Sequence, residues 1–124
     1  MKKLSFVFLF VIFIFSCATN WVNLHPSLPD LTNKPDGVYR GDYDVTKTPV
    51  SVVLDVTVSN GRVTQIKIIQ HKCSPIGRRA EKITEKIINE QSLSVDTVSG
   101  ATASSKGILM AVENALQSTY PAAF

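Results

Sequence analysis

Residues 51–70 read SVVLDVTVSNGRVTQIKIIQ and contain two runs in which apolar and polar side chains alternate. Side chains of a strand point to opposite faces in turn, so alternation places the apolar ones on a single face. In the first run these residues are Val52, Leu54, Val56 and Val58. In the second run, over 62–70, Ile66 and Ile68 share a face. The pattern predicts two antiparallel strands with one apolar face.

The loop at residues 59–61 sets how these strands pair. A two-residue Asn60-Gly61 turn would place apolar residues of one strand opposite polar residues of the other. A three-residue loop would instead pair Leu54 with Ile66 and Val52 with Ile68, which buries one apolar face. We therefore expect the three-residue loop, with Gly61 in the left-handed conformation at a bulged turn.

Further elements are expected on both sides of this hairpin. Asp36-Gly37 is a turn signal, and residues 38–43 alternate aromatic and polar side chains as an edge strand does. Ser74-Pro75 is typical of a helix start, so we predict a helix from there to about Gln91. Its apolar stripe consists of Ile76, Ala80, Ile83 and Ile87.

A second stripe has the spacing i, i+3, i+4, i+7, i+8 and predicts a helix over about 104–118. It consists of Ile108, Ala111, Val112, Ala115 and Leu116. Strands followed by helices indicate an α+β fold: an N-terminal β-meander forms an antiparallel sheet, and two amphipathic helices cover one of its faces.

The N-terminus has the features of an export signal. Two lysines follow Met1, and the apolar run over 4–15 is too short to anchor the chain across a bilayer. The run ends at Ser16-Cys17, which resembles the lipobox of bacterial lipoproteins. We expect residues 1–16 to be a signal peptide and Cys17 to carry a lipid that anchors the protein to the outer side of the cell membrane, facing the periplasm or the cell surface. Cleavage nearby in an ordinary secreted protein is the alternative.

After cleavage, residues 17–35 would form a lipidated tether rich in proline, and residues 36–124 one folded domain. Without Lys2 and Lys3 the formal charge falls from +3 to +1, which argues against a nucleic-acid partner. Cys73 would have no disulfide partner once Cys17 is lipidated. His71 and Cys73 alone make a poor metal site, so we predict no metal.

Residues 96–105 read DTVSGATASS and lead into the second helix. Gly100 and Ala101 allow the backbone to approach a ligand closely, and Thr102 places a hydroxyl where a helix presents unpaired N–H groups. Helix N-termini favour anions, so this run is suited to hold a phosphate group. The alternative is a helix entry that serine and threonine merely cap.

The same run resembles the D-x-x-S/T-G-A-T signature of the FMN-binding domain family, known from the G subunit of Rnf complexes and the C subunit of sodium-pumping NADH:quinone reductase. The matching residues are Asp96, Ser99, Gly100, Ala101 and Thr102. In that family a flavin transferase esterifies the last threonine of the signature with the phosphate of FMN. The resemblance thus implies FMN attached to Thr102, and Asp96 as part of what the transferase recognises. Asp96 equally suits a turn cap.

Four further residues are candidates for contact with FMN: Ser104, Ser105, Arg78 and His71. Ser104 and Ser105 follow the signature directly. Arg78 and its neighbour Arg79 would lie in the first turn of the first helix, where positive charge opposes the helix dipole and a nearby anion would relieve it. A solvated surface position is the alternative for both arginines. His71 is the fourth candidate.

The residues show no G-x-S-x-G elbow around Ser99 and no evident base for hydrolysis. The resemblance implies a lipid-anchored flavoprotein that carries electrons between redox partner proteins or quinone-linked complexes, rather than a stand-alone enzyme. A flavin-free binding or structural lipoprotein, whose residues 99–102 only cap a helix, is the alternative.

Overall fold

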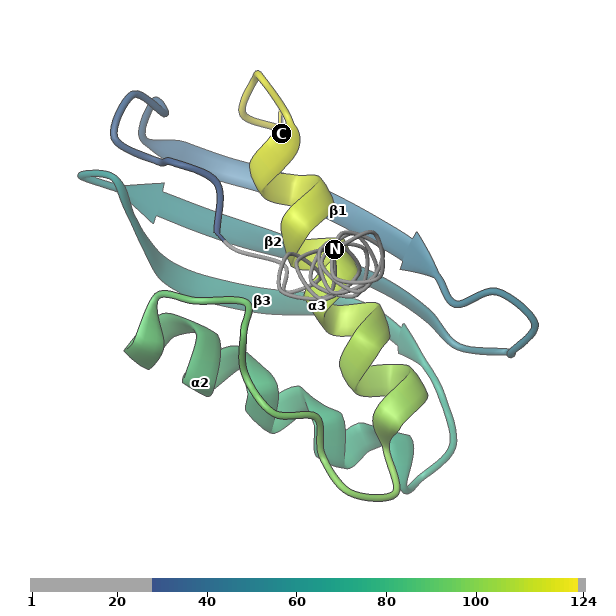
Figure 1. Cartoon of the computed structure of the whole chain (residues 1–124). Helices are drawn as coiled ribbons and strands as arrows, with labels where there is room; N and C mark the ends of the chain where they lie inside the picture. The colour runs from purple at the N-terminus through teal and green to yellow at the C-terminus, as the bar shows by residue number, and fades with distance from the viewer. Residues whose placement is uncertain (1–27, 123–124) are drawn as a thin grey trace, which may run out of the picture.

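The computed structural model describes residues 28–122 (Figure 1). The expected signal peptide, Cys17 and the first part of the tether lie outside this range. Three strands form an antiparallel sheet in the order β1 (Gly37–Asp44), β2 (Ser51–Ser59) and β3 (Arg62–Lys72). A 3₁₀ helix η2 (Gly77–Lys82), then α2 (Ile83–Glu90) and α3 (Thr102–Gln117) follow. The expected α+β fold with an antiparallel sheet is confirmed.

The helices lie on one side of the sheet. Figure 1 shows α3 crossing the sheet in front of β1 and β2, both of which it contacts, while α2 contacts β3. The interior residues of β2 are those that the alternation predicted, and all four are almost fully buried: Val52, Leu54, Val56 and Val58. The opposite face of the sheet carries a bidentate ion pair between Arg40 and Asp55, with N···O distances of 2.8 and 2.9 Å.

The turn between β2 and β3 differs from the expected three-residue loop. Ser59 pairs with Arg62, so the turn has two residues, and both Asn60 (φ 52°) and Gly61 (φ 72°) are left-handed. Two left-handed residues match the twist of the flanking strands, which is why Asn-Gly favours this turn. The positive φ of Gly61 is confirmed, but the loop length was wrong.

A β-bulge restores the apolar pairing that the short turn would otherwise disrupt. The register shifts between Thr57 and Val58, after which Val56 pairs with Ile66 and Leu54 with Ile68. The expected pairing of Leu54 with Ile66 was therefore wrong by two residues. One extra residue in β3 moves the following side chains of this strand to the opposite face of the sheet. The bulge thereby brings apolar residues opposite one another, which the longer loop was expected to do.

The first predicted helix is divided and begins later than expected. The N–H of Gly77 donates to Ser74 Oγ (3.2 Å), but the first turns form η2, and α-helical geometry begins only at Ile83. Ile76 was expected on the buried stripe, yet it is 55% exposed. It precedes η2, and a 3₁₀ turn rotates side chains differently from an α-helical one. The other three stripe residues, Ala80, Ile83 and Ile87, are fully buried.

The segment before β1 contacts the domain from Leu28 onward, although it was assigned to the tether. Leu31 is buried in the core. The Lys34 ammonium donates to the carbonyl of Ser118 beyond the end of α3 and lies 4.0 Å from the centroid of the Tyr39 ring. Partial burial lowers the pKa of this ammonium. Within residues 28–122, no helix is long and apolar enough to cross a membrane.

Glycine permits α3 to approach β1 closely. A Cβ added to Gly41 would lie 1.9 Å from the carbonyl oxygen of Ala111 and 2.8 Å from the Cβ of Ala115. Both distances are shorter than van der Waals contact allows, and the first involves backbone that cannot rotate away. Any side chain at position 41 would push α3 from the sheet.

We therefore expect Gly41→Ala to lower the free energy of unfolding by about 3 kcal/mol or more, as severe overpacking does. Gly107→Ala is the matched control, because its added Cβ would meet side-chain methyl groups and no backbone: those of Val45, Val52 and Val50, at 3.1, 3.2 and 3.7 Å. Its strain is offset by the higher helix propensity of alanine, worth about 1 kcal/mol. Urea unfolding of both variants measures the difference, and equal stabilities would contradict this account of the packing.

Candidate functional site

A tight turn over residues 98–101 leads into α3. The N–H of Ala101 donates to the carbonyl of Val98 (3.0 Å), and Gly100 has a φ of +79°. This conformation favours glycine, because a side chain there would be strained. Within 4 Å, a Cβ on Gly100 would meet only the Cγ2 of Ile76, at 3.6 Å. The turn thus leaves open space above Gly100, bordered by Ile76.

Ser105 holds this turn from inside the protein. Its side chain is fully buried, accepts a hydrogen bond from the N–H of Val98 (3.0 Å) and donates one to the carbonyl of Ala101 (2.7 Å). A single hydroxyl therefore ties the start of the turn to its end. The conformation of the loop before α3 depends on a residue inside the helix.

Thr102 is the first residue of α3 and is exposed. The preceding residue, Ala101, has no side-chain oxygen to cap the helix, and the first turn contains no acidic residue. The first N–H groups of a helix have no partner within it, and its dipole places partial positive charge there. The hydroxyl of Thr102 therefore stands beside unpaired N–H groups at the end of a 16-residue helix, a setting that favours an anion.

The next hydroxyl in the run points the other way. Ser104 is 3% exposed and packs against η2, where a Cβ on Gly77 would lie 2.6 Å from Ser104 Oγ and 2.9 Å from the Cβ of Cys73. Ser104 and Ser105 are thus enclosed, whereas Ser99 and Thr102 are exposed. Four hydroxyls in seven residues divide into two that a large ligand reaches and two that it does not.

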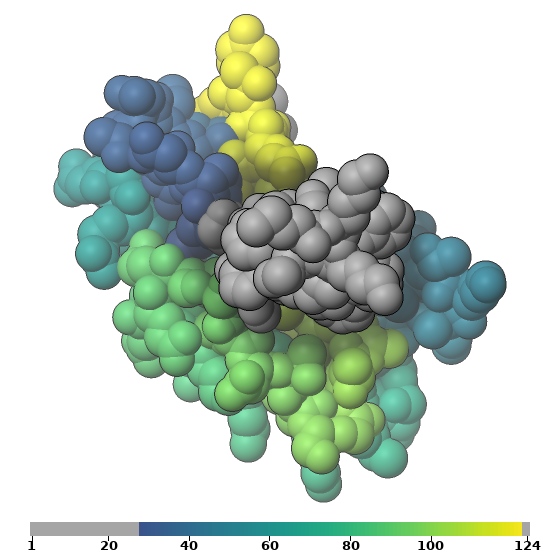
Figure 2. Space-filling view, viewed as in Figure 1, coloured from purple at the N-terminus to yellow at the C-terminus, as the bar shows by residue number. Residues whose placement is uncertain are grey.

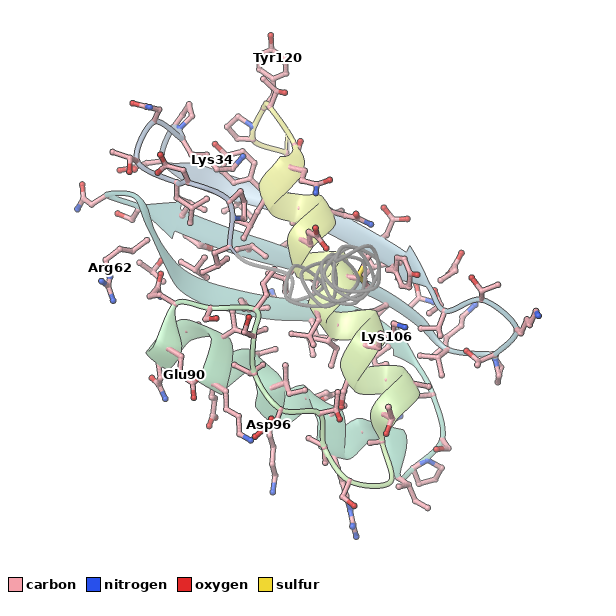
Figure 3. The ribbon with its side chains drawn as sticks, in the orientation of Figure 1. Lys34, Arg62, Glu90, Asp96, Lys106 and Tyr120 are labelled. Carbon is pink, nitrogen blue, oxygen red and sulfur yellow. The ribbon has the colours of Figure 1, made fainter. Side chains whose placement is uncertain are left out.

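The structure places the charged candidates on the surface. Asp96 is exposed in the loop before α3, and Figure 3 shows its side chain on this loop. The same loop lies on the face of the molecule seen in Figure 2. Arg78 and Arg79 are exposed in η2. Arg78 lies in the first turn of η2, as expected for the start of the first helix, although this helix is 3₁₀ there, and Arg79 lies in the last turn of η2.

The side chain of His71 is enclosed by the protein, whereas Thr102 is exposed. It pairs with Val52 across the sheet, and its side chain is 3% exposed. Its Nδ1 lies 3.1 Å from Glu81 Oε1. Cys73 is a partly buried free thiol. Residues 28–122 contain no group of three or more histidine, cysteine, aspartate or glutamate residues that could hold a metal ion.

Comparison with known proteins agrees with the geometry. Residues 47–117 match the FMN-binding domain family. The chain belongs to this family. An uncharacterized protein of Treponema pallidum (strain Nichols) is 36% identical over 88 residues, which are 69% of this chain and 24% of the relative. The chain therefore spans about a quarter of the length of that protein.

As an FMN-binding domain, the protein is a flavoprotein with FMN as its cofactor. The matched segment includes β2, β3, both α-helices and the turn before Thr102, and it leaves β1 outside. The donor set fits FMN: an uncapped helix N-terminus suits the phosphate, and Gly100 leaves the space that a larger group needs.

Ile76 is a further candidate for the site, one that the sequence pattern does not indicate. Its side chain is 55% exposed and borders the turn at Gly100, where it offers an apolar surface to a ring system. Helical periodicity assigned Ile76 to the core. No local signal in the sequence marks the late start of the α-helix, because Pro75 also suits the first turn of a regular helix.

Ser105→Ala should lower the free energy of unfolding by about 1–3 kcal/mol, because it leaves the part-buried N–H of Val98 without an acceptor. Ser99→Ala is the control. Ser99 is exposed in the same loop, and its substitution should change stability by less than about 0.5 kcal/mol. Chemical denaturation measures both variants, and equal stabilities would show that Ser105 does not hold the turn.

Proposed function

We propose that this protein is a membrane-anchored, extracytoplasmic flavoprotein that carries FMN through a phosphoester at Thr102 and passes electrons between redox partners. Family membership supports flavin binding. The observation that carries the attachment site is the exposure of Thr102 at the uncapped start of α3, next to two enclosed serines. A flavin transferase would form the bond between the flavin phosphate and Thr102 Oγ.

The chain's own residues would bind and orient the cofactor. The first N–H groups of α3 and the helix dipole favour the phosphate. Gly100 leaves room beside the phosphate, and the exposed side chain of Ile76 offers an apolar surface to the isoalloxazine ring. Arg78, exposed in η2, supplies positive charge. The flavin itself supplies the redox chemistry.

An exposed site suits an electron carrier better than an enzyme with its own substrate. Thr102, Gly100 and Asp96 are all exposed, so partner proteins or a quinone-linked complex would reach the ring directly. Covalent attachment also keeps the flavin at the site where it would otherwise dissociate outside the cytoplasm.

The proposed anchor rests on the sequence at residues 1–17. A charged start, a short apolar run and Ser16-Cys17 indicate a lipoprotein signal. A lipid on Cys17 would hold the domain at the outer side of the cell membrane.

Thr102→Ala should abolish covalent flavin. Wild-type protein co-expressed with a flavin transferase should gain the mass of one FMN less one water, whereas Thr102→Ala should gain nothing. Ser99→Ala is the matched control, since Ser99 is the other exposed hydroxyl of this turn, and it should still be loaded. Intact mass and peptide mapping measure the outcome.

Flavin mapped to Ser99, Ser104 or Ser105 would contradict the assignment to Thr102. Absence of covalent flavin in wild-type protein made with an active transferase would contradict the phosphoester itself.

Cys17→Ser should yield uncleaved or unlipidated precursor, because the lipid would be attached to the thiol of this residue. Mass spectrometry of the membrane fraction detects the acylated N-terminus of the wild type. The anchor proposal would be wrong if the variant still partitioned into membranes as mature-sized, acylated protein.

A further inference from the structure

A β-bulge near the end of β3 determines where His71 points. Successive residues of β2 pair with Ile68 and Gln70, so Ile69 has no partner. Side chains of a strand alternate between its faces, and an unbulged β3 would turn Gln70 toward the helices. The extra residue turns His71 there instead, opposite Val52.

Packing alone does not explain a histidine at this position. The side chain is 3% exposed, and Nε2 is enclosed without a hydrogen-bond partner among the described residues. An unpartnered buried nitrogen is unfavourable, and an apolar side chain would avoid it. The other nitrogen, Nδ1, lies 3.1 Å from Glu81 Oε1 and can donate to it in the tautomer that carries the proton on Nδ1. The bond to Glu81 is thus the interaction that a histidine adds.

Glu81 belongs to η2, an element that depends on tertiary contacts. Hydrogen bonds in 3₁₀ helices have poorer geometry than those in α-helices, and at the start of η2 the Ile76 side chain makes no capping bond, while the N–H of Gly77 donates to Ser74 Oγ at 3.2 Å. One end of η2 packs through Gly77 against Ser104 of α3. Toward its other end, Glu81 bonds to His71 of β3. These two contacts hold η2 against α3 and against β3.

We infer that His71 is a positioning residue of the flavin site: through Glu81 it holds η2 in the place that keeps Ile76 beside Gly100. This inference rests on the proposed function. Ile76 lies five residues before Glu81, which is about 10 Å along a 3₁₀ helix. His71 therefore acts through η2 and does not touch the flavin.

Four variants test this inference: Glu81→Ala, Glu81→Gln, Ile76→Ser and Glu85→Ala. Glu81→Ala removes the acceptor, whereas Glu81→Gln keeps an amide oxygen that accepts from Nδ1. Ile76→Ser shows what the loss of the apolar surface does to the flavin. Glu85 is the matched control, an exposed glutamate in the first turn of α2.

The first measurement is backbone hydrogen exchange in the flavin-free protein. Amides of η2 should exchange about fivefold faster in Glu81→Ala, the factor that one hydrogen bond of typical net strength contributes. Glu81→Gln and Glu85→Ala should exchange as the wild type does.

The second measurement uses protein carrying FMN, after intact mass has shown that each variant is loaded. The fluorescence anisotropy of the flavin should fall in Glu81→Ala toward the value of Ile76→Ser, because the ring loses its apolar contact. Anisotropy in Glu81→Gln and Glu85→Ala should equal that of the wild type.

Faster exchange in η2 with unchanged anisotropy would overturn the positioning role and leave His71 a structural residue. Two results would overturn the hydrogen-bond account: amide exchange of η2 that is unchanged in Glu81→Ala, or amide exchange of η2 that is as fast in Glu81→Gln as in Glu81→Ala. If the wild type itself gains no flavin by mass, the proposed function fails and this inference fails with it.

Discussion

The close approach of α3 to β1 determines where the start of α3 lies. Gly41 has no side chain, so the backbone of β1 lies close to Ala111 and Ala115 of α3. A Cβ at position 41 would lie 1.9 Å from the carbonyl oxygen of Ala111. Such contact fixes the path of a 16-residue helix across the sheet, and with it the position of the helix's first residue. The exposed end at Thr102 is placed by packing along the body of the helix. A carrier whose cofactor is attached at one residue needs this rigidity, because partner access depends on where that residue lies.

The first turn of α3 separates two kinds of hydroxyl within a few residues. Helical residues advance by about 100° each, so neighbours in sequence face different surroundings. Ser105 bonds back to the turn at Val98, Ser104 packs beside Gly77, and Thr102 remains outside. The buried serines hold the loop in shape, while the exposed threonine is available to a ligand. The hydroxyls that stabilise the loop are therefore not the one to which we propose that the flavin is attached.

Much of the fold could be predicted from the sequence, since alternation and helical periodicity record which side chains must be buried. The interior face of β2 and the stripe of α3 are buried as expected. The register was wrong because Asn60-Gly61 favours the short turn and the bulge in β3 left no local signal. Ile76 was misplaced because a 3₁₀ segment interrupts the α-helical period. Irregular backbone of this kind is stabilised by contacts between distant residues, which periodicity does not record.

The order of the amino acids is enough to predict the class of fold, the strands, the helix α3 and the signature that ends at Thr102. These follow from local patterns: the period of apolar residues, turn-forming dipeptides and a short motif. Packing in the folded chain determines that Ser104 and Ser105 are enclosed, that Ile76 borders Gly100 and that His71 reaches Glu81. The exposure of these side chains depends on where η2 lies against α3 and β3. Sequence neighbours do not specify that arrangement, because it arises from packing between elements that meet only in the folded chain.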